Sequence, residues 1–144
     1  MTYKYTGGCY CRNITFEMET ASELSSYSPR ACDCNFCTKH SASYISDNNG
    51  KLTISVKSES NLNRYKQGDE IADFLICKIC GVLIGACYED RRRLYATINS
   101  KAVDRNFDFA TDTVVSPKTL NGDRKKQRWR DFWFSNVDFE NKIL

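Results

Sequence analysis

Proline is scarce in this sequence, and long apolar runs are absent. Its two prolines in 144 residues form no proline-rich linker, and no internal repeat or low-complexity block interrupts the chain. A chain of this length, without a linker or repeat to divide it, is predicted to form one domain over residues 1–144. Residues 1–8 lack the apolar run of a signal peptide, and the longest apolar stretch, residues 82–87, is too short to span a bilayer. We therefore expect a soluble, cytoplasmic protein without a membrane partner.

A strong net charge is also lacking. The sequence has 21 Lys and Arg against 18 Asp and Glu, a net charge of +3 that by itself favours neither nucleic-acid nor membrane partners. Residues 124–130 form the densest basic run and include Trp129, so they could contact phosphates. Because the pI of about 8.4 is below the value of about 9 expected of a nucleic-acid-binding domain, we rank this alternative second. Arg30, Lys39 and Arg64 could bind ligand carboxylates, although isolated basic residues are usually solvated.

Cysteine, in contrast, is abundant, with eight residues. An even number in a short secreted chain would suggest disulfides, but no secretion signal is present and a reducing cytosol disfavours stable disulfides. Seven of the eight fall in three tight groups, while Cys87 stands alone: Cys9-x-Cys11, Cys32-x-Cys34-x-x-Cys37 and Cys77-x-x-Cys80. A metal needs several thiolates within about 2.3 Å of one point. The grouping therefore predicts metal ligands.

Cys77, Cys80 and Gly81 have the form of a zinc knuckle. A spacing of two residues lets both sulfurs face one metal, and Gly81 can take the positive φ often needed after the second ligand. Two more ligands must come from elsewhere, and Cys9 and Cys11 can supply them, because alternate residues of a strand share a face. The alternative is that both pairs are buried core cysteines.

Cys32, Cys34 and Cys37 offer three ligands rather than four. Structural zinc sites usually have four protein ligands, whereas catalytic sites keep one position for water or substrate. This group is therefore predicted to bind an exogenous thiol and to act in catalysis. The alternative is a second structural site, closed by a fourth ligand from elsewhere in the chain: Cys87, His40 or Asp33. Lys39 and His40 could offset the negative charge of the thiolates, and His40 could also move a proton.

The hydrophobic pattern predicts mainly β structure. Residues 13–19 alternate, with Ile14, Phe16 and Met18 on one face, and residues 51–56 alternate in the same way. Further strands are expected at residues 73–76, 82–88 and 93–98, with a turn at 47–50. Helix is expected only as short segments at 35–39 and 124–130. The sequence from residue 101 onward has no clear period.

The ordered motifs resemble the glutathione-dependent formaldehyde-activating enzyme family, which includes relatives of centromere protein V. The resemblance spans roughly residues 7–98 and is carried by Gly7-Gly8-Cys9-x-Cys11-x-x-Ile14-x-Phe16, by Cys32-x-Cys34-x-x-Cys37-x-x-x-Ser41-Ala42, and by Cys77-x-x-Cys80-Gly81. It implies a mainly β, Mss4-like fold of small twisted antiparallel sheets. It also implies a structural zinc on Cys9, Cys11, Cys77 and Cys80, and a functional zinc on Cys32, Cys34 and Cys37.

The family's reaction adds glutathione to formaldehyde and gives S-hydroxymethylglutathione, which in reverse is a carbon–sulfur lyase step. The resemblance therefore predicts a zinc enzyme whose partner is a small-molecule thiol such as glutathione. We expect the three-ligand site to hold its zinc less firmly and to be partly occupied after purification. The alternative is a non-catalytic zinc module that binds a protein or a nucleic acid.

Overall fold

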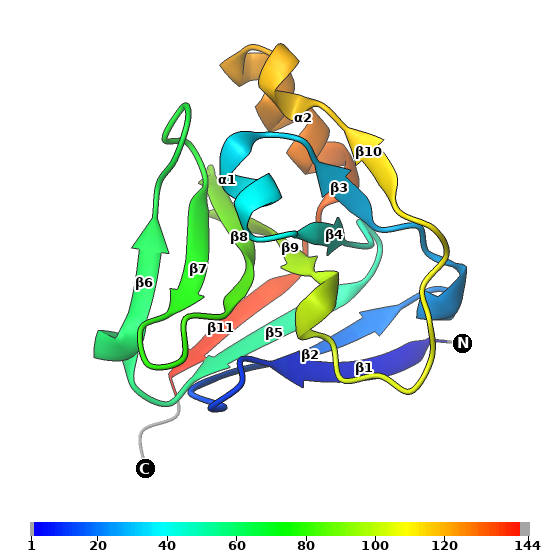
Figure 1. Cartoon of the computed structure of the whole chain (residues 1–144), viewed down its shortest axis with the longest axis vertical. Helices are drawn as coiled ribbons and strands as arrows, with labels where there is room; N and C mark the ends of the chain where they lie inside the picture. The colour runs from blue at the N-terminus through cyan, green and yellow to red at the C-terminus, as the bar shows by residue number, and fades with distance from the viewer. Residues whose placement is uncertain (1, 142–144) are drawn as a thin grey trace.

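Two β-sheets make up most of the regular structure in the computed structural model, which describes residues 2–141 (Figure 1). One sheet has four strands in the order β1-β2-β5-β11, and the other has seven in the order β10-β3-β4-β9-β8-β7-β6. The strands are β1 (Tyr3–Gly8), β2 (Ile14–Thr20), β3 (Arg30–Cys32), β4 (Ser43–Ile45), β5 (Lys51–Val56), β6 (Leu62–Tyr65), β7 (Asp73–Cys77), β8 (Leu83–Asp90), β9 (Arg93–Asn99), β10 (Thr113–Val115) and β11 (Val137–Asn141). Residues 1 and 142–144 of the predicted domain lie outside the described part.

The prediction of a mainly β fold built from small antiparallel sheets is confirmed. The pairs β3–β10 and β5–β11 are parallel, and the other strand pairs described are antiparallel. All five predicted strands are present as β2, β5, β7, β8 and β9. The strands that the sequence pattern missed are short or lie at sheet edges, where few side chains are buried to mark a period.

The core lies between the sheets. On β2, Ile14, Phe16 and Met18 are buried, whereas Thr15 and Glu17 on the opposite face are not, as the alternation predicts. The three buried residues pair across the sheet with three equally buried residues of β5, namely Val56, Ile54 and Leu52. Each such side chain contributes roughly 1.5–3 kcal/mol on burial. These contacts fix the register of the four-stranded sheet, because a slip of one residue would expose them.

Helices are few and short. They are α1 (Asn35–Lys39), α2 (Gly122–Phe132) and the 3₁₀ turns η1 (Leu24–Ser26), η2 (Glu59–Asn61), η3 (Ser100–Ala102) and η4 (Pro117–Thr119). Both predicted helical segments are confirmed by α1 and α2. The longest described helix, α2, has 11 residues, and none is long and apolar enough to cross a membrane.

Helix α2 is held over the seven-stranded sheet at its C-terminal end. Phe134, which is fully buried, exchanges two backbone hydrogen bonds with Ala96 of β9. The side-chain amide of Asn48 donates to the backbone oxygens of Arg130 and Trp133 at 2.8 and 2.9 Å. These bonds satisfy carbonyl groups that a helix end leaves open, and they fix α2 beside β9 and above α1 and β3 (Figure 1).

Candidate functional site

The structure brings Cys9, Cys11, Cys77 and Cys80 together. Their sulfur atoms all lie within 4.8 Å of one another, with 3.8 Å between Cys9 and Cys11 and 3.6 Å between Cys11 and Cys77. Sulfurs about 2.3 Å from a tetrahedral zinc would be separated by about 3.8 Å, whereas a disulfide would bring them to about 2.05 Å. All eight cysteines are free. The donor set and its spacing therefore fit a zinc ion.

Two turns present these four sulfurs. Cys77 ends β7, and the following turn closes with a hydrogen bond from the Gly81 N–H to the Cys77 carbonyl at 2.9 Å. Gly81 has a φ of 77°, as predicted, a value that side chains with a Cβ rarely adopt. The prediction that Cys9 and Cys11 lie on a strand was wrong: β1 ends at Gly8, and both residues lie in the turn that leads to β2.

The tight packing of these sulfurs separates their pKa values. Burial raises the pKa of Cys9 to about 12 and also raises that of Cys77. Burial acts in the same direction on Cys80, but hydrogen bonds from the backbone N–H groups of Cys11 and Val82 and from the side chains of Cys77 and Cys11 together lower its pKa to about 6. Neighbouring thiolates repel, so four ionised sulfurs at this spacing require a cation among them.

The structure also brings Cys32, Cys34 and Cys37 within 4.8 Å of one another, from three different local settings. Cys32 ends β3. Cys34 is the N-cap of α1, where its sulfur accepts a hydrogen bond from the Cys37 backbone N–H at 3.4 Å. Cys37 lies inside α1 and is buried. The strand-to-helix transition therefore folds the C-x-C-x-x-C segment around a single point.

A buried tyrosine completes the surroundings of Cys37. The hydroxyl of Tyr44 on β4 lies 3.1 Å from the Cys37 sulfur. A hydrogen bond from Cys37 lowers the pKa of Cys32 to about 6, and the same contact together with burial raises the pKa of Cys37. Burial, followed by the charge of Cys37, raises the pKa of Tyr44. The contact between Cys32 and Cys37 thus moves their pKa values in opposite directions.

None of the three proposed closing residues joins this second group within residues 2–141. Cys87 on β8 points to the opposite sheet face from its neighbour Ala86, which lines the pocket beside the three sulfurs, and the Cys87 sulfur lies 3.9 Å from the Arg64 guanidinium. The exposed ring of His40 packs on Phe36 with 4.7 Å between centroids. The Asp33 carboxylate accepts a hydrogen bond from Ser116 and pairs with Lys118 at 3.8 Å.

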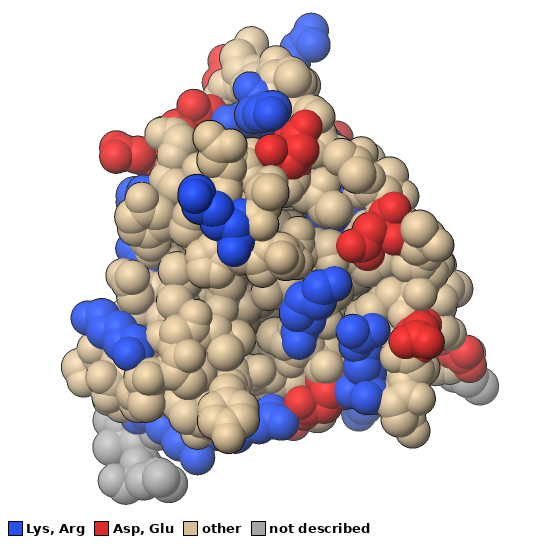
Figure 2. All heavy atoms as spheres, in the orientation of Figure 1, with Lys and Arg blue, Asp and Glu red and all other residues tan. Residues whose placement is uncertain are grey.

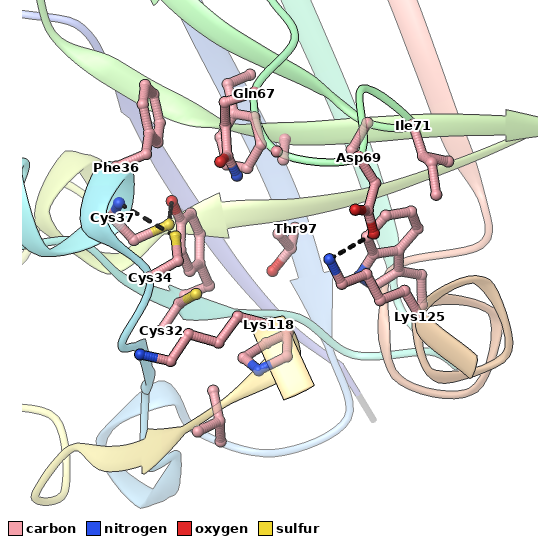
Figure 3. Close-up of a pocket in the computed structure, with 18 of the residues that line it drawn as sticks. Cys32, Cys34, Phe36, Cys37, Gln67, Asp69, Ile71, Thr97, Lys118 and Lys125 are labelled. Atoms are coloured by element: carbon pink, nitrogen blue, oxygen red, sulfur yellow. Dashed lines mark hydrogen bonds and ion pairs between the residues drawn. The ribbon is translucent and has the colours of Figure 1, made fainter. Parts of the chain in front are cut away.

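A pocket of about 420 Å³ opens beside Cys32, Cys34 and Cys37 (Figure 3). Its walls are partly apolar, with Phe36, Phe74, Trp129 and Trp133 among the lining residues. Among the described residues, four cations also line it: Arg30, Lys118, Lys125 and Arg128. Neither Lys39 nor His40, the two residues predicted to offset the thiolate charge, is among the lining residues. The compensating charges come instead from β3, from η4 and from α2.

Sequence reasoning missed the α2 wall of this pocket. The basic run was considered only as a second-ranked phosphate-binding segment, but Lys125, Arg128 and Trp129 line the pocket and Arg130 pairs with Asp90 at 2.9 Å. Trp129 stacks on Trp133 with 4.9 Å between centroids. The spacing of four residues between the two tryptophans, one helical turn, is the only sequence signal for this wall. It does not reveal what the helix covers.

Comparisons with known proteins give one family and one fold. The family model described as "Glutathione-dependent formaldehyde-activating enzyme" matches residues 4–118. A crystal structure of a Rhodobacter sphaeroides protein has a similar fold, with a TM-score of 0.50 and 21% sequence identity over 72% of this chain and 90% of that chain. No curated protein matches the chain. The family match ends before α2, which begins at Gly122.

Proposed function

Because the chain belongs to the glutathione-dependent formaldehyde-activating enzyme family, we propose that it adds a small-molecule thiol to a small carbonyl compound. The reaction would join glutathione and formaldehyde to give S-hydroxymethylglutathione, and its reverse is a carbon–sulfur lyase step. Two zinc ions would be held, one by Cys9, Cys11, Cys77 and Cys80, and one by Cys32, Cys34 and Cys37. Since the two sheets share one core, residues 1–144 would act as a single zinc-binding domain.

The observation that carries this proposal is the second cysteine group. Three sulfurs converge, no fourth protein ligand joins them within the described residues, and a pocket opens beside them. Zinc at this group would supply a Lewis acid that lowers the pKa of an incoming thiol. The first group has four sulfurs and no need of an outside ligand, which suits a structural role.

The chemical step balances without an oxidant or a reductant. The thiol sulfur forms a bond to the carbonyl carbon, the π pair of the carbonyl moves onto oxygen, and the proton lost from sulfur ends on that oxygen. In this step Cys32, Cys34 and Cys37 would hold the zinc ion that receives the thiol at the end of the pocket. Tyr44 would position the Cys37 sulfur through its hydrogen bond, and Phe36 and Phe74 would keep water from the reacting atoms.

The charges in the pocket support the same step. Three thiolates around one divalent ion carry a net negative charge, and an incoming thiolate would add to it. Lys118 lies near this end of the pocket, where it pairs only at 3.8 Å with Asp33 (Figure 3). An exposed cation at this distance from its partner is free to reorient toward a bound anion.

The proposal is tested by the rate of adduct exchange. Glutathione and ¹³C-formaldehyde combine slowly without a catalyst, so exchange NMR of the labelled carbon reports any acceleration. The zinc-loaded protein should speed exchange, Cys37→Ser should abolish the effect, and Cys87→Ala, which lies outside the pocket, should retain it. A wild-type protein that leaves the spontaneous rate unchanged with formaldehyde and with other small aldehydes would refute the proposed activity.

A further inference from the structure

Arg30 and the first thiol of the second cysteine group lie on the same face of one strand. Strand β3 consists of Arg30, Ala31 and Cys32. Alternate side chains of a strand point the same way, and residues two apart are separated by roughly 7 Å. Both Arg30 and Cys32 line the pocket accordingly. A positive charge is thus built into the pocket at a fixed distance from the sulfurs.

The Arg30 guanidinium is held in place by neutral groups. Its Nη2 donates to Ser46 Oγ at 2.6 Å and to Thr97 Oγ1 at 3.5 Å. The Ser46 hydroxyl donates its proton to the backbone carbonyl of Phe132, and the Thr97 hydroxyl donates its proton to that of Ile45. Both hydroxyls can therefore only accept hydrogen bonds from Arg30. Within residues 2–141, Arg30 Nε and Nη1 have no hydrogen-bond partner and are not fully buried. Donors of the guanidinium therefore remain for a ligand.

Arg30 also has no carboxylate partner, unlike the two lysines of the pocket. Lys125 pairs with Asp69 at 2.6 Å and Lys118 with Asp33 at 3.8 Å. Neither Arg30 nor Arg128 forms an ion pair in the described part of the chain. Both guanidinium groups line the same pocket, close enough for the charge of Arg128 to act on Arg30. Two guanidinium groups that repel each other in a partly buried site would be stabilised by an anion between them.

The position of Thr97 places this charge along the path of a bound thiol. In Figure 3, Thr97 lies in the middle of the pocket, between the sulfurs of Cys34 and Cys37 on one side and Lys125 on the other. Because Arg30 contacts the Thr97 hydroxyl, its guanidinium lies in this middle region. A ligand whose sulfur reaches the cysteine group would extend its remaining atoms past Arg30 toward α2.

We infer that Arg30 and Arg128 form a subsite for the carboxylate of the thiol substrate, so that the pocket selects thiols with a carboxylate a few bonds from the sulfur. The planar guanidinium fork matches a carboxylate and binds it through two hydrogen bonds. The inference relies on the proposed function only for the position of the sulfur. Arg128 belongs to α2, beyond the residues that match the family model, so the family match by itself does not imply this subsite.

Two thiols that differ only at the carboxylate test the inference. Isothermal titration of the zinc-loaded protein would compare 3-mercaptopropionate with 3-mercaptopropionamide. The acid should bind at least about tenfold more tightly than the amide, since hydrogen bonds to charged groups have about this effect. Arg30→Met should remove the preference, and Arg30→Lys should restore part of it.

Two further variants keep the test decisive if Arg30→Met does not fold. Arg128→Met, on the surface of α2, should also reduce the preference. Arg105→Met removes an exposed arginine that lies outside the pocket and should change nothing. Inorganic phosphate at millimolar concentration should compete weakly, and a site that binds phosphate but does not prefer the acid would overturn carboxylate selectivity.

The outcomes separate this inference from the proposed function. Equal binding of acid and amide to wild-type protein overturns the carboxylate subsite but leaves the thiol reaction intact. A preference that depends on Arg30, in a protein that forms no adduct with formaldehyde, supports the subsite and refutes the reaction. Failure of both thiols to bind overturns both.

Discussion

The hydroxyl oxygen of Tyr44 lies 3.1 Å from the sulfur of Cys37, and both side chains are buried. A hydrogen bond to a metal ligand fixes its orientation, and loss of such a bond typically weakens metal binding 10- to 100-fold. Tyr44→Phe removes the hydroxyl and keeps the ring. We expect a folded protein whose more weakly held zinc is lost about tenfold more readily to a chromophoric chelator. Tyr95→Phe, at a tyrosine outside the pocket, serves as control, and equal zinc retention in both variants would contradict the assigned role.

The two cysteine groups should differ in what their loss does to stability. Cys11 and Cys77 are 66 positions apart, and their turns join the four-stranded sheet to the seven-stranded sheet (Figure 1). Metal binding that requires the folded chain contributes to folding free energy, and closing a long loop constrains the unfolded chain more than closing a short one. Cys80→Ser should therefore cost several kcal/mol and lower the melting temperature sharply.

Cys37→Ser should cost less stability than Cys80→Ser, because residues 32–37 close only a local loop. We expect a folded protein that retains one zinc ion per chain. Circular dichroism melts and elemental analysis of both variants provide the comparison. If Cys37→Ser unfolds the domain as severely as Cys80→Ser, the second group is structural.

Cys87 should be dispensable for metal binding. It lies on the sheet face away from the pocket, within the apolar core. Cys87→Ala should leave the zinc content and the adduct exchange rate unchanged and cost on the order of 1 kcal/mol in packing. Loss of one zinc ion in this variant would show that Cys87 closes the second site after all.

Cys87 should also make the stability of the folded protein depend on pH. Burial raises the pKa of Cys87 from its ordinary 9.0 to about 11. The folded state therefore keeps a proton that the unfolded chain releases, so the contribution is fully present below about pH 9 and is lost as the pH rises toward about 11. The full effect is at most about 2.7 kcal/mol. Urea unfolding from about pH 8 to 11 should show wild-type protein losing stability relative to Cys87→Ala, and a constant difference would refute the assignment.

Much of the fold and both cysteine groups could be predicted from the sequence, because each rests on a local pattern. Ile14, Phe16 and Met18 alternate with polar residues in the sequence, and these three side chains are buried on one face of β2. The C-x-x-C and C-x-C spacings place cysteines close enough along the backbone for their sulfurs to lie together. Gly81 was expected to have a positive φ on the same local grounds, and it does.

The far side of the pocket could not be predicted, because it depends on tertiary contacts. Helix α2 reaches the pocket only because Phe134 bonds to Ala96 and Asn48 caps the helix end, and these partners are distant in sequence. Nothing in the spacing of Lys125 and Arg128 indicates that they face the cysteines. Tyr44 was missed for the same reason, because the contact between its hydroxyl and the Cys37 sulfur forms only in the folded chain.

The basic segment 124–130 should bind nucleic acid only weakly. Lys125 and Arg128 line the pocket, Arg130 pairs with Asp90, and on the face shown in Figure 2 basic and acidic side chains are interspersed. Binding to duplex DNA should be non-specific and fall steeply with salt. Fluorescence anisotropy with duplexes of different sequence checks this expectation. Submicromolar, sequence-selective binding at physiological salt would favour a nucleic-acid-binding module instead.

The capture of an outside thiol by Cys32, Cys34 and Cys37 is tested most directly by titrating the zinc-loaded protein with glutathione and with S-methylglutathione. The two ligands share their carboxylates, but only glutathione has a free thiol. Isothermal titration should show much tighter binding of glutathione to wild-type protein, with release of a proton, and Cys37→Ser should bind both ligands equally. Equal affinity of the two ligands for the wild-type protein would contradict the proposal that this cysteine group receives the substrate sulfur.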